Sequence, residues 1–241
     1  MKLLLGTWYS FGELFETEIV HALEVSESAN VIHENTVSGI IFSSSHVSNK
    51  EKGNEIEQII SKYRPRANAS NIGVGIRYSR CGEFKSGNNS EAWNILLVSD
   101  FIVCIFYLTE DIYKSGPIQA SKTVGKIFSE WKKWVHEING NVTVYGESGP
   151  WASEGFIWNN VQNMKEYWNA MSAWAQKNEF VVFMGGAFDN PLKEDERDSL
   201  HRASAPHEGW WRLRSNEDIS VTGFVEKITG ILCIPYLFPS F

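Results

Sequence analysis

The sequence predicts an α/β fold built on a parallel sheet. Short apolar segments rich in β-branched residues alternate with amphipathic segments of helical periodicity about six times along the chain. The segment at 96–107 is apolar on both faces, as expected of a strand covered on both sides in a parallel sheet. Such alternation is typical of parallel strands joined by helical crossovers.

The periodicity of the apolar residues predicts where each strand and helix begins and ends. The expected strands cover residues 2–7, 37–42, 71–78, 96–107, 142–145 and 180–184. The expected helices cover residues 12–28, 53–63, 120–138 and 161–177. Gly73 and Gly75 weaken the third strand, because glycine offers the sheet no side chain to pack. In the helix at 120–138, Val124, Ile127, Trp131 and Val135 form one apolar stripe that should pack on the sheet.

Two architectures fit this order of elements, a doubly wound sheet and a (β/α)₈ barrel. A doubly wound nucleotide-binding sheet carries a glycine-rich phosphate loop after an early strand, and this sequence has none. We therefore favour a barrel, in which functional residues lie where strands end at their carboxyl side. The pattern decays after Arg214, so we expect a partial barrel at 1–214 and an apolar tail at 215–241.

Composition excludes several classes of protein. With 241 residues, 43% of them hydrophobic, the chain can bury a large core and is not a disordered or fibrous protein. A formal net charge of -7 disfavours a nucleic-acid partner. The apolar runs near both ends are too short for a signal peptide or a membrane span, so no membrane partner is expected. Ten tryptophans exceed what such a core needs and favour a ligand cleft.

The cysteines indicate neither a disulfide framework nor a metal site. Cys81, Cys104 and Cys233 are few and scattered, and no pair has metal-ligand spacing. Cys104 stands in the middle of an apolar strand, which predicts an inert buried thiol. No metal and no cofactor is expected.

Several polar and aromatic residues stand where the predicted strands end, among them Trp8, Tyr107 and Glu147. Glu147 is a carboxylate directly at a strand terminus, between small residues and shortly before Trp151. Small neighbours would let a ligand approach the carboxylate, and an aromatic ring nearby could stack on that ligand. The alternative interpretation is a surface glutamate beside a turn.

The segment around Glu147 reads Tyr-Gly-Glu-Ser-Gly-Pro-Trp-Ala-Ser-Glu-Gly. With Pro150 counted as an insertion, it resembles the G-E-x-G-W-P-S-x-G motif of the family 17 glycoside hydrolases, the β-1,3-glucanases. Further matches in the same order are Leu-Leu-Gly-Thr-Trp at 4–8, Ser-Asp-Phe-Ile at 99–102, Phe-Met-Gly-Gly-Ala-Phe-Asp-Asn-Pro-Leu-Lys at 183–193 and His-Glu-Gly-Trp-Trp-Arg-Leu at 207–213. The resemblance spans roughly residues 2–213.

The resemblance implies a retaining mechanism on a (β/α)₈ scaffold that lacks the first two βα units here. Retention needs two carboxyl groups roughly 5–5.5 Å apart, one as nucleophile and one as acid/base. The family's nucleophile carries over to Glu147, whereas its acid/base position holds Ser45, which is not a carboxylate. His46 is a possible substitute acid, although strand alternation would send it to the opposite side of the sheet from Ser45.

The implied ligand is a β-1,3-glucan polysaccharide or oligosaccharide. Flat rings can stack on the C–H face of a pyranose, so Trp8, Tyr107, Trp151 and Phe188 are candidate sugar-binding residues, together with Asp189. The missing acid leaves open a catalytically inactive glucan-binding relative, or a truncated copy without function. The sequence itself gives no compartment, while the resemblance suggests a secreted or cell-wall-associated protein.

Overall fold

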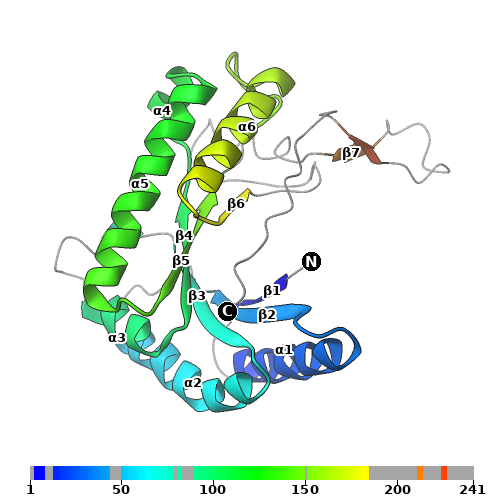
Figure 1. The fold of residues 1–241 in the computed structure, drawn as a ribbon, viewed down its shortest axis with the longest axis vertical. Coiled ribbons are helices and arrows are strands. Elements are labelled where there is room, and N and C mark those ends of the chain that lie inside the picture. The colour runs from blue at the N-terminus through cyan, green and yellow to red at the C-terminus, as the bar shows by residue number, and fades with distance from the viewer. Residues whose placement is uncertain are drawn as a thin grey trace. The chain divides into compact units, whose positions relative to one another are not determined.

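The computed structural model describes residues 3–8, 13–43, 50–78, 81–82, 90–149, 151–184, 211–213 and 224–226. The strands are β1 (Leu3–Trp8), β2 (Val37–Ser43), β3 (Gly73–Tyr78), β4 (Phe101–Phe106), β5 (Thr143–Ser148), β6 (Val182–Met184), β7 (Trp211–Leu213) and β8 (Phe224–Glu226). The helices are α1 (Glu13–Ile32), α2 (Lys50–Ala69), α3 (Ser90–Val98), α4 (Glu110–Lys114), α5 (Pro117–Ile138) and α6 (Val161–Lys177) (Figure 1).

Strands β1 to β6 form one sheet in the order of the sequence, whereas β7 pairs with β8 in a separate antiparallel ribbon. The β1–β2, β2–β3, β3–β4 and β5–β6 pairs are all parallel. Helices alternate with these strands along the chain, as a parallel connection requires. The predicted α/β fold with sequential parallel strands is therefore confirmed.

The strand predicted at 96–107 is wrong in its first part. Helix α3 continues to Val98, and β4 begins only at Phe101. Ser99 is buried at the break, where its hydroxyl donates to the carbonyl of Ile95 at 2.8 Å, as a side chain does at a helix end. An apolar run can belong to a helix or to a strand. Here the polar residues Ser99 and Asp100 divide the run between helix α3 and strand β4.

Asp100 fixes the start of β4 in the sheet. Its carboxylate accepts a hydrogen bond from Arg64 of α2 at 2.6 Å and another from the backbone N–H of Val74 at 2.8 Å. Because one carboxylate joins a helix, β3 and β4, this residue has a structural role. This structural role is enough to explain the aspartate in the Ser-Asp-Phe-Ile segment at 99–102. It requires no contact between Asp100 and a ligand.

Glycines in β2 and β3 leave room for one large ring. A Cβ at Gly39 would lie 2.7 Å from the ring of Phe101, and a Cβ at Gly75 would overlap Phe101 itself. The Phe101 ring also packs on Tyr145, with centroids 5.6 Å apart. The glycines that weakened the strand prediction thus serve packing on this face of the sheet.

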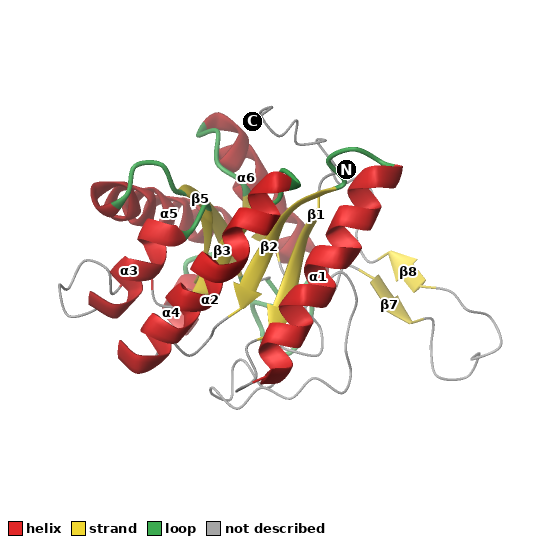
Figure 2. Cartoon of the chain, turned by 90° about the horizontal axis from the view of Figure 1, so that it is seen from below, coloured by secondary structure: helices red, strands yellow, loops and turns green. Residues whose placement is uncertain are grey.

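The opposite face of β1–β3 is covered by helices. Phe42 of β2 packs edge-on against Phe15 of α1, with centroids 6.1 Å apart. Figure 2 shows α1 and α2 lying along β1, β2 and β3 on one side. Strands β2 and β3 therefore have one helix-covered face and one face on which glycines meet the Phe101 ring.

The chain divides into two compact units. The first comprises Met1–Ile105, Ser129–Tyr145 and Phe238–Phe241, and the second Phe106–Phe128 and Gly146–Leu237. In the second unit, Phe128, Trp174 and Phe180 form an aromatic cluster. The expected boundary at 214 stays a prediction, because only Phe224–Glu226 of the tail is described.

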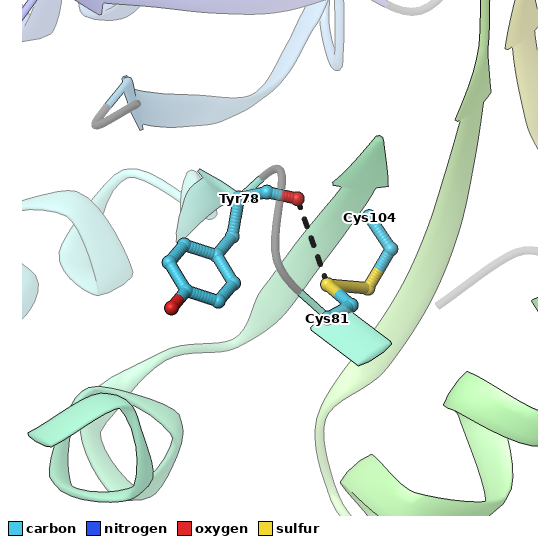
Figure 3. The surroundings of a disulfide bond; sticks show 3 residues. All are labelled: Tyr78, Cys81 and Cys104. Atoms are coloured by element: carbon cyan, nitrogen blue, oxygen red, sulfur yellow. Dashed lines mark hydrogen bonds between the residues drawn. A yellow bond between two sulfur atoms is a disulfide. The ribbon is translucent and has the colours of Figure 1, made fainter. Parts of the chain in front are cut away.

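Cys81 and Cys104 form a disulfide bond within the first unit (Figure 3). Their Cα atoms are 5.7 Å apart, and neither residue is exposed. The parallel register pairs Tyr78 of β3 with Cys104 of β4, so Cys81, three residues after Tyr78, is within reach of its partner. The expectation that Cys104 is a free thiol is therefore wrong. Cys233 lies outside the described residues.

Candidate functional site

Glu147 lies near the carboxyl end of β5, on the face opposite the helices. Its two neighbours face helices: a Cβ at Gly146 would lie 2.7 Å from the Phe128 ring of α5, and Ser148 hydrogen-bonds Tyr167 of α6 at 2.6 Å. Successive side chains of a strand point to opposite faces, so Glu147 points away from these helices. The carboxylate is half-buried. In a barrel this face and this strand end are where catalytic groups stand.

Tyr107 stands at the end of the strand beside Glu147. The backbone N–H of Gly149 donates to the carbonyl of Phe106 at 2.8 Å, which joins the end of β4 to the segment after β5. A Cβ at Gly149 would lie 3.4 Å from the Cα of Tyr107, which is ordinary van der Waals contact, so the two backbones lie side by side here. Tyr107 is 39% exposed. The structure thus places Tyr107 and Glu147 at the same edge of the second unit.

A buried hydrogen-bonded pair holds the end of β5 in place. The Tyr167 hydroxyl lies 2.6 Å from the hydroxyl of Ser148, which in turn donates to the carbonyl of Gly149 at 2.9 Å. The single hydroxyl proton of Ser148 goes to the carbonyl of Gly149, so the Tyr167 phenol is the donor to Ser148. Burial raises the pKa of Tyr167 and keeps this phenol protonated. The sequence analysis missed this pair, whose only signal is a tyrosine on the buried stripe of the helix that follows Glu147.

Trp151 is 1% exposed and belongs to the core of the second unit. Its ring packs edge-on against Tyr113 at 4.8 Å and tilted against Tyr167 at 5.7 Å, and its indole N–H donates to the carbonyl of Trp158 at 3.0 Å. This geometry differs from the open sugar platform expected from the sequence. Trp151 supports the loop after β5 and offers no ring face to a ligand in this structure.

The other sequence-predicted site residues lie in segments that the structure does not describe, or describes only through the backbone. Ser45, His46, Phe188 and Asp189 lie outside the described residues. Trp8 is the last residue of β1, and only its backbone is described. The assignment of Ser45 to the acid/base position therefore stays a prediction.

Tyr167 gives the fold a measurable sensitivity to alkali. Its pKa is raised by burial, so its contribution to stability is complete below the usual tyrosine pKa of about 10 and is lost as the pH rises further. We expect the free energy of unfolding to decrease above about pH 10, with a shallower decrease in Tyr167→Phe. At pH 7 this variant should lose about 1 kcal/mol with the Ser148 hydrogen bond. Urea unfolding between pH 7 and 11 measures both effects, and an unchanged slope in the variant would contradict the assignment.

The described part of the chain gives no sign of a metal centre or a membrane span. Within it, no group of three or more His, Cys, Asp or Glu side chains is placed to hold a metal ion. No helix among the described segments is long and apolar enough to cross a bilayer.

Comparison with known proteins identifies the fold. The structure is similar to the crystal structure of the glycoside hydrolase family 17 β-1,3-glucanosyltransferase from Rhizomucor miehei, with a TM-score of 0.58 and 16% identity over 88% of this chain and 72% of that one. An active-site mutant of the same enzyme in complex with laminaritriose gives a TM-score of 0.57 at 16% identity, with the same coverage of both chains. No family model and no curated protein matches the sequence. The predicted resemblance to family 17 is thus confirmed for the fold, a glycoside hydrolase-like α/β barrel scaffold.

Proposed function

We propose that this chain acts on β-1,3-glucan by a retaining mechanism in which Glu147 is the nucleophile. The observation that carries the proposal is the position of Glu147, at the carboxyl end of a strand and on the face away from α5 and α6. The family 17 fold of the chain and the laminaritriose held by its structural relative support the choice of substrate.

In the first step, a carboxylate oxygen of Glu147 would attack the anomeric carbon as the bond to the leaving oxygen breaks. Water, or a second sugar hydroxyl, would then displace Glu147 and restore the original anomeric configuration. The leaving oxygen of a glucan needs a proton, and the position of the family's acid holds Ser45. A positioned acid typically contributes about 10²–10⁴-fold. We therefore expect slow cleavage of glucan and much faster release of a leaving group that needs no proton.

This expectation can be tested with a dinitrophenyl β-glucoside. Its leaving group departs as a stable anion, so the chain should form the glucosyl-enzyme at Glu147 without an acid. Azide should then speed turnover at least about tenfold, because it attacks the intermediate without needing a general base. The product should be β-glucosyl azide, identified by NMR. Rapid hydrolysis of laminarin with no effect of azide would contradict the assignment of Ser45 to the acid position.

The second candidate function is glucan binding without catalysis, and the serine in the acid position favours it. A binding protein would show saturable binding of laminarin-type oligosaccharides, no turnover of the aryl glucoside, and unchanged affinity in Glu147→Gln. A truncated copy without function would instead unfold in a broad transition of low cooperativity. Calorimetry and thermal unfolding of the full chain separate these alternatives from the enzyme.

We also propose that the protein works in an oxidising compartment, as a secreted or wall-associated glucan-acting protein would. The Cys81–Cys104 disulfide supports this, because such bonds persist in exported proteins and are rare in reducing cytosol. Extracellular glucan is also where an enzyme of this kind would meet a polysaccharide substrate. Neither a nucleic-acid nor a membrane partner is part of the proposal.

A further inference from the structure

The loop between β5 and α6 is held in place by several of its own polar groups. The carbonyl of Trp158 accepts two hydrogen bonds, from the indole of Trp151 at 3.0 Å and from the Asn163 side chain at 2.7 Å. The backbone N–H of Asn159 donates to the carbonyl of Phe156 at 2.8 Å, which closes a tight turn around the two residues between them. A surface loop bonded in this way presents its side chains in a fixed arrangement.

The side chains that this turn presents are apolar. Phe156 and Trp158 stack with their rings nearly parallel, at 5.4 Å between centroids and 8° between planes. Both rings are half-buried, and Ile157 between them is 93% exposed. We call Phe156, Ile157 and Trp158 the apolar tip. Lys114, which forms an ion pair with Glu110, lies with its Nζ over the Trp158 ring at 5.9 Å from the centroid, so a cation stands beside the tip.

Fixed aromatic rings with an exposed aliphatic side chain and a cation beside them suit a ligand that is itself amphipathic. A pyranose offers such a surface, with C–H groups on its faces and hydroxyl groups around its edge. The loop directly continues β5, the strand that carries Glu147. A polysaccharide bound at Glu147 extends beyond the sugar units that react, so the rest of its chain needs a surface of this chemistry.

We infer that the apolar tip binds a stretch of β-glucan beyond the sugar units at Glu147. This inference rests on the proposed function, since it takes its ligand from there. The tip would act on long chains only, by holding the polymer near the site. A small aryl glucoside would not reach beyond the reacting position and would not sense the tip.

The test compares full-length variants of the tip with a matched control. In Phe156→Ala/Ile157→Ser the backbone hydrogen bonds of the turn remain possible, so the loop should keep its form. Ile118→Ser serves as the control, because it removes an exposed aliphatic side chain, 55% exposed, at the start of α5 in the same unit. Thermal unfolding establishes that each variant is folded, and retention on insoluble β-1,3-glucan particles gives its affinity.

We expect Phe156→Ala/Ile157→Ser to bind the particles about fivefold more weakly than the unchanged chain. Its reaction with the dinitrophenyl glucoside should be unaffected, and Ile118→Ser should behave as the unchanged chain in both assays. Equal retention of the tip variant, or an equal loss in Ile118→Ser, would overturn the inference while leaving Glu147 as nucleophile. If the unchanged chain neither binds the particles nor reacts with the glucoside, the proposed function itself is wrong.

Two alternative roles of the apolar tip, dimer formation and lipid binding, would each give a different experimental result. If the tip joined two copies of the chain, size-exclusion chromatography would show a dimer that the Phe156→Ala/Ile157→Ser variant converts to a monomer. If it entered a lipid surface, the unchanged chain would sediment with phosphatidylcholine vesicles and the variant would not. Either result, with unchanged retention on glucan, would overturn the assignment of the tip to a polysaccharide.

Discussion

Replacement of Glu147 by glutamine is expected to lower turnover of an aryl β-glucoside by more than about 10³-fold. The amide has nearly the same size and can keep hydrogen bonds, but it carries no negative charge and is a poor nucleophile. Because the side chain is half-buried and points away from α5 and α6, the change should leave the fold intact. Initial rates of dinitrophenol release measure the effect.

Glu154→Gln provides the control, because it makes the same chemical change at an exposed glutamate in the loop that follows β5. This variant should retain nearly full turnover. If Glu147→Gln kept more than about a tenth of the activity, or if Glu154→Gln lost as much, Glu147 would not be the nucleophile.

Removal of the Cys81–Cys104 disulfide should lower the free energy of unfolding by about 3 kcal/mol. The bond joins residues 23 apart in the sequence, and the loss of a loop closure of that length in the unfolded chain is worth about this much. Both cysteines are fully buried, so replacement by alanine keeps the site apolar. Urea unfolding of the Cys81→Ala/Cys104→Ala variant, beside the unchanged chain, measures the difference.

The single replacements distinguish a disulfide from two free thiols. If the bond is formed, either single variant loses it entirely, so each should be about as unstable as the double variant. Two independent thiols would instead give single losses that add up in the double variant. Titration of thiols in the unreduced, unfolded chain should find Cys233 alone. A titration that finds all three cysteines would contradict the bond.

The sequence was sufficient to predict those helices and strands that are determined by residues close together in the chain. The helix predicted at 161–177 has the bounds that the structure gives to α6, and this helix buries one face and exposes the other. The run at 96–107 misled because its apolar residues belong to two elements: Leu96, Leu97 and Val98 end helix α3, where Leu97 is exposed, whereas β4 is almost wholly buried. A short apolar run does not by itself separate a helix end from a strand.

The contacts that shape the site join segments far apart in the sequence, and periodicity does not encode them. Trp151 was expected to face a ligand, but its ring fills a space between Tyr113 and Tyr167. Cys81 and Cys104 find each other through the register of β3 against β4, which the cysteine spacing alone does not reveal. The position of Glu147 at a strand end was predictable, because the β5 segment and the glycines around it are local features.

The aromatic residues that we propose to contact a glucan differ from those expected from the sequence. Of the rings expected to bind sugar, Tyr107 is exposed beside the end of β5, while Trp151 is buried. The apolar tip adds Phe156 and Trp158, which the sequence analysis did not select. The exposure of a ring decides whether it is a candidate, because a sugar can stack only on an accessible ring face.

The most direct test of the account is mass spectrometry of the full chain after reaction with dinitrophenyl 2-fluoro-β-glucoside, whose fluorine slows breakdown of a glucosyl-enzyme. We expect a mass increase of one fluoroglucosyl group, located by digestion on the peptide that contains Glu147. The adduct should be absent in Glu147→Gln and present in Glu154→Gln. An adduct on another residue, or none on a chain that still turns over the aryl glucoside, would contradict Glu147 as the nucleophile.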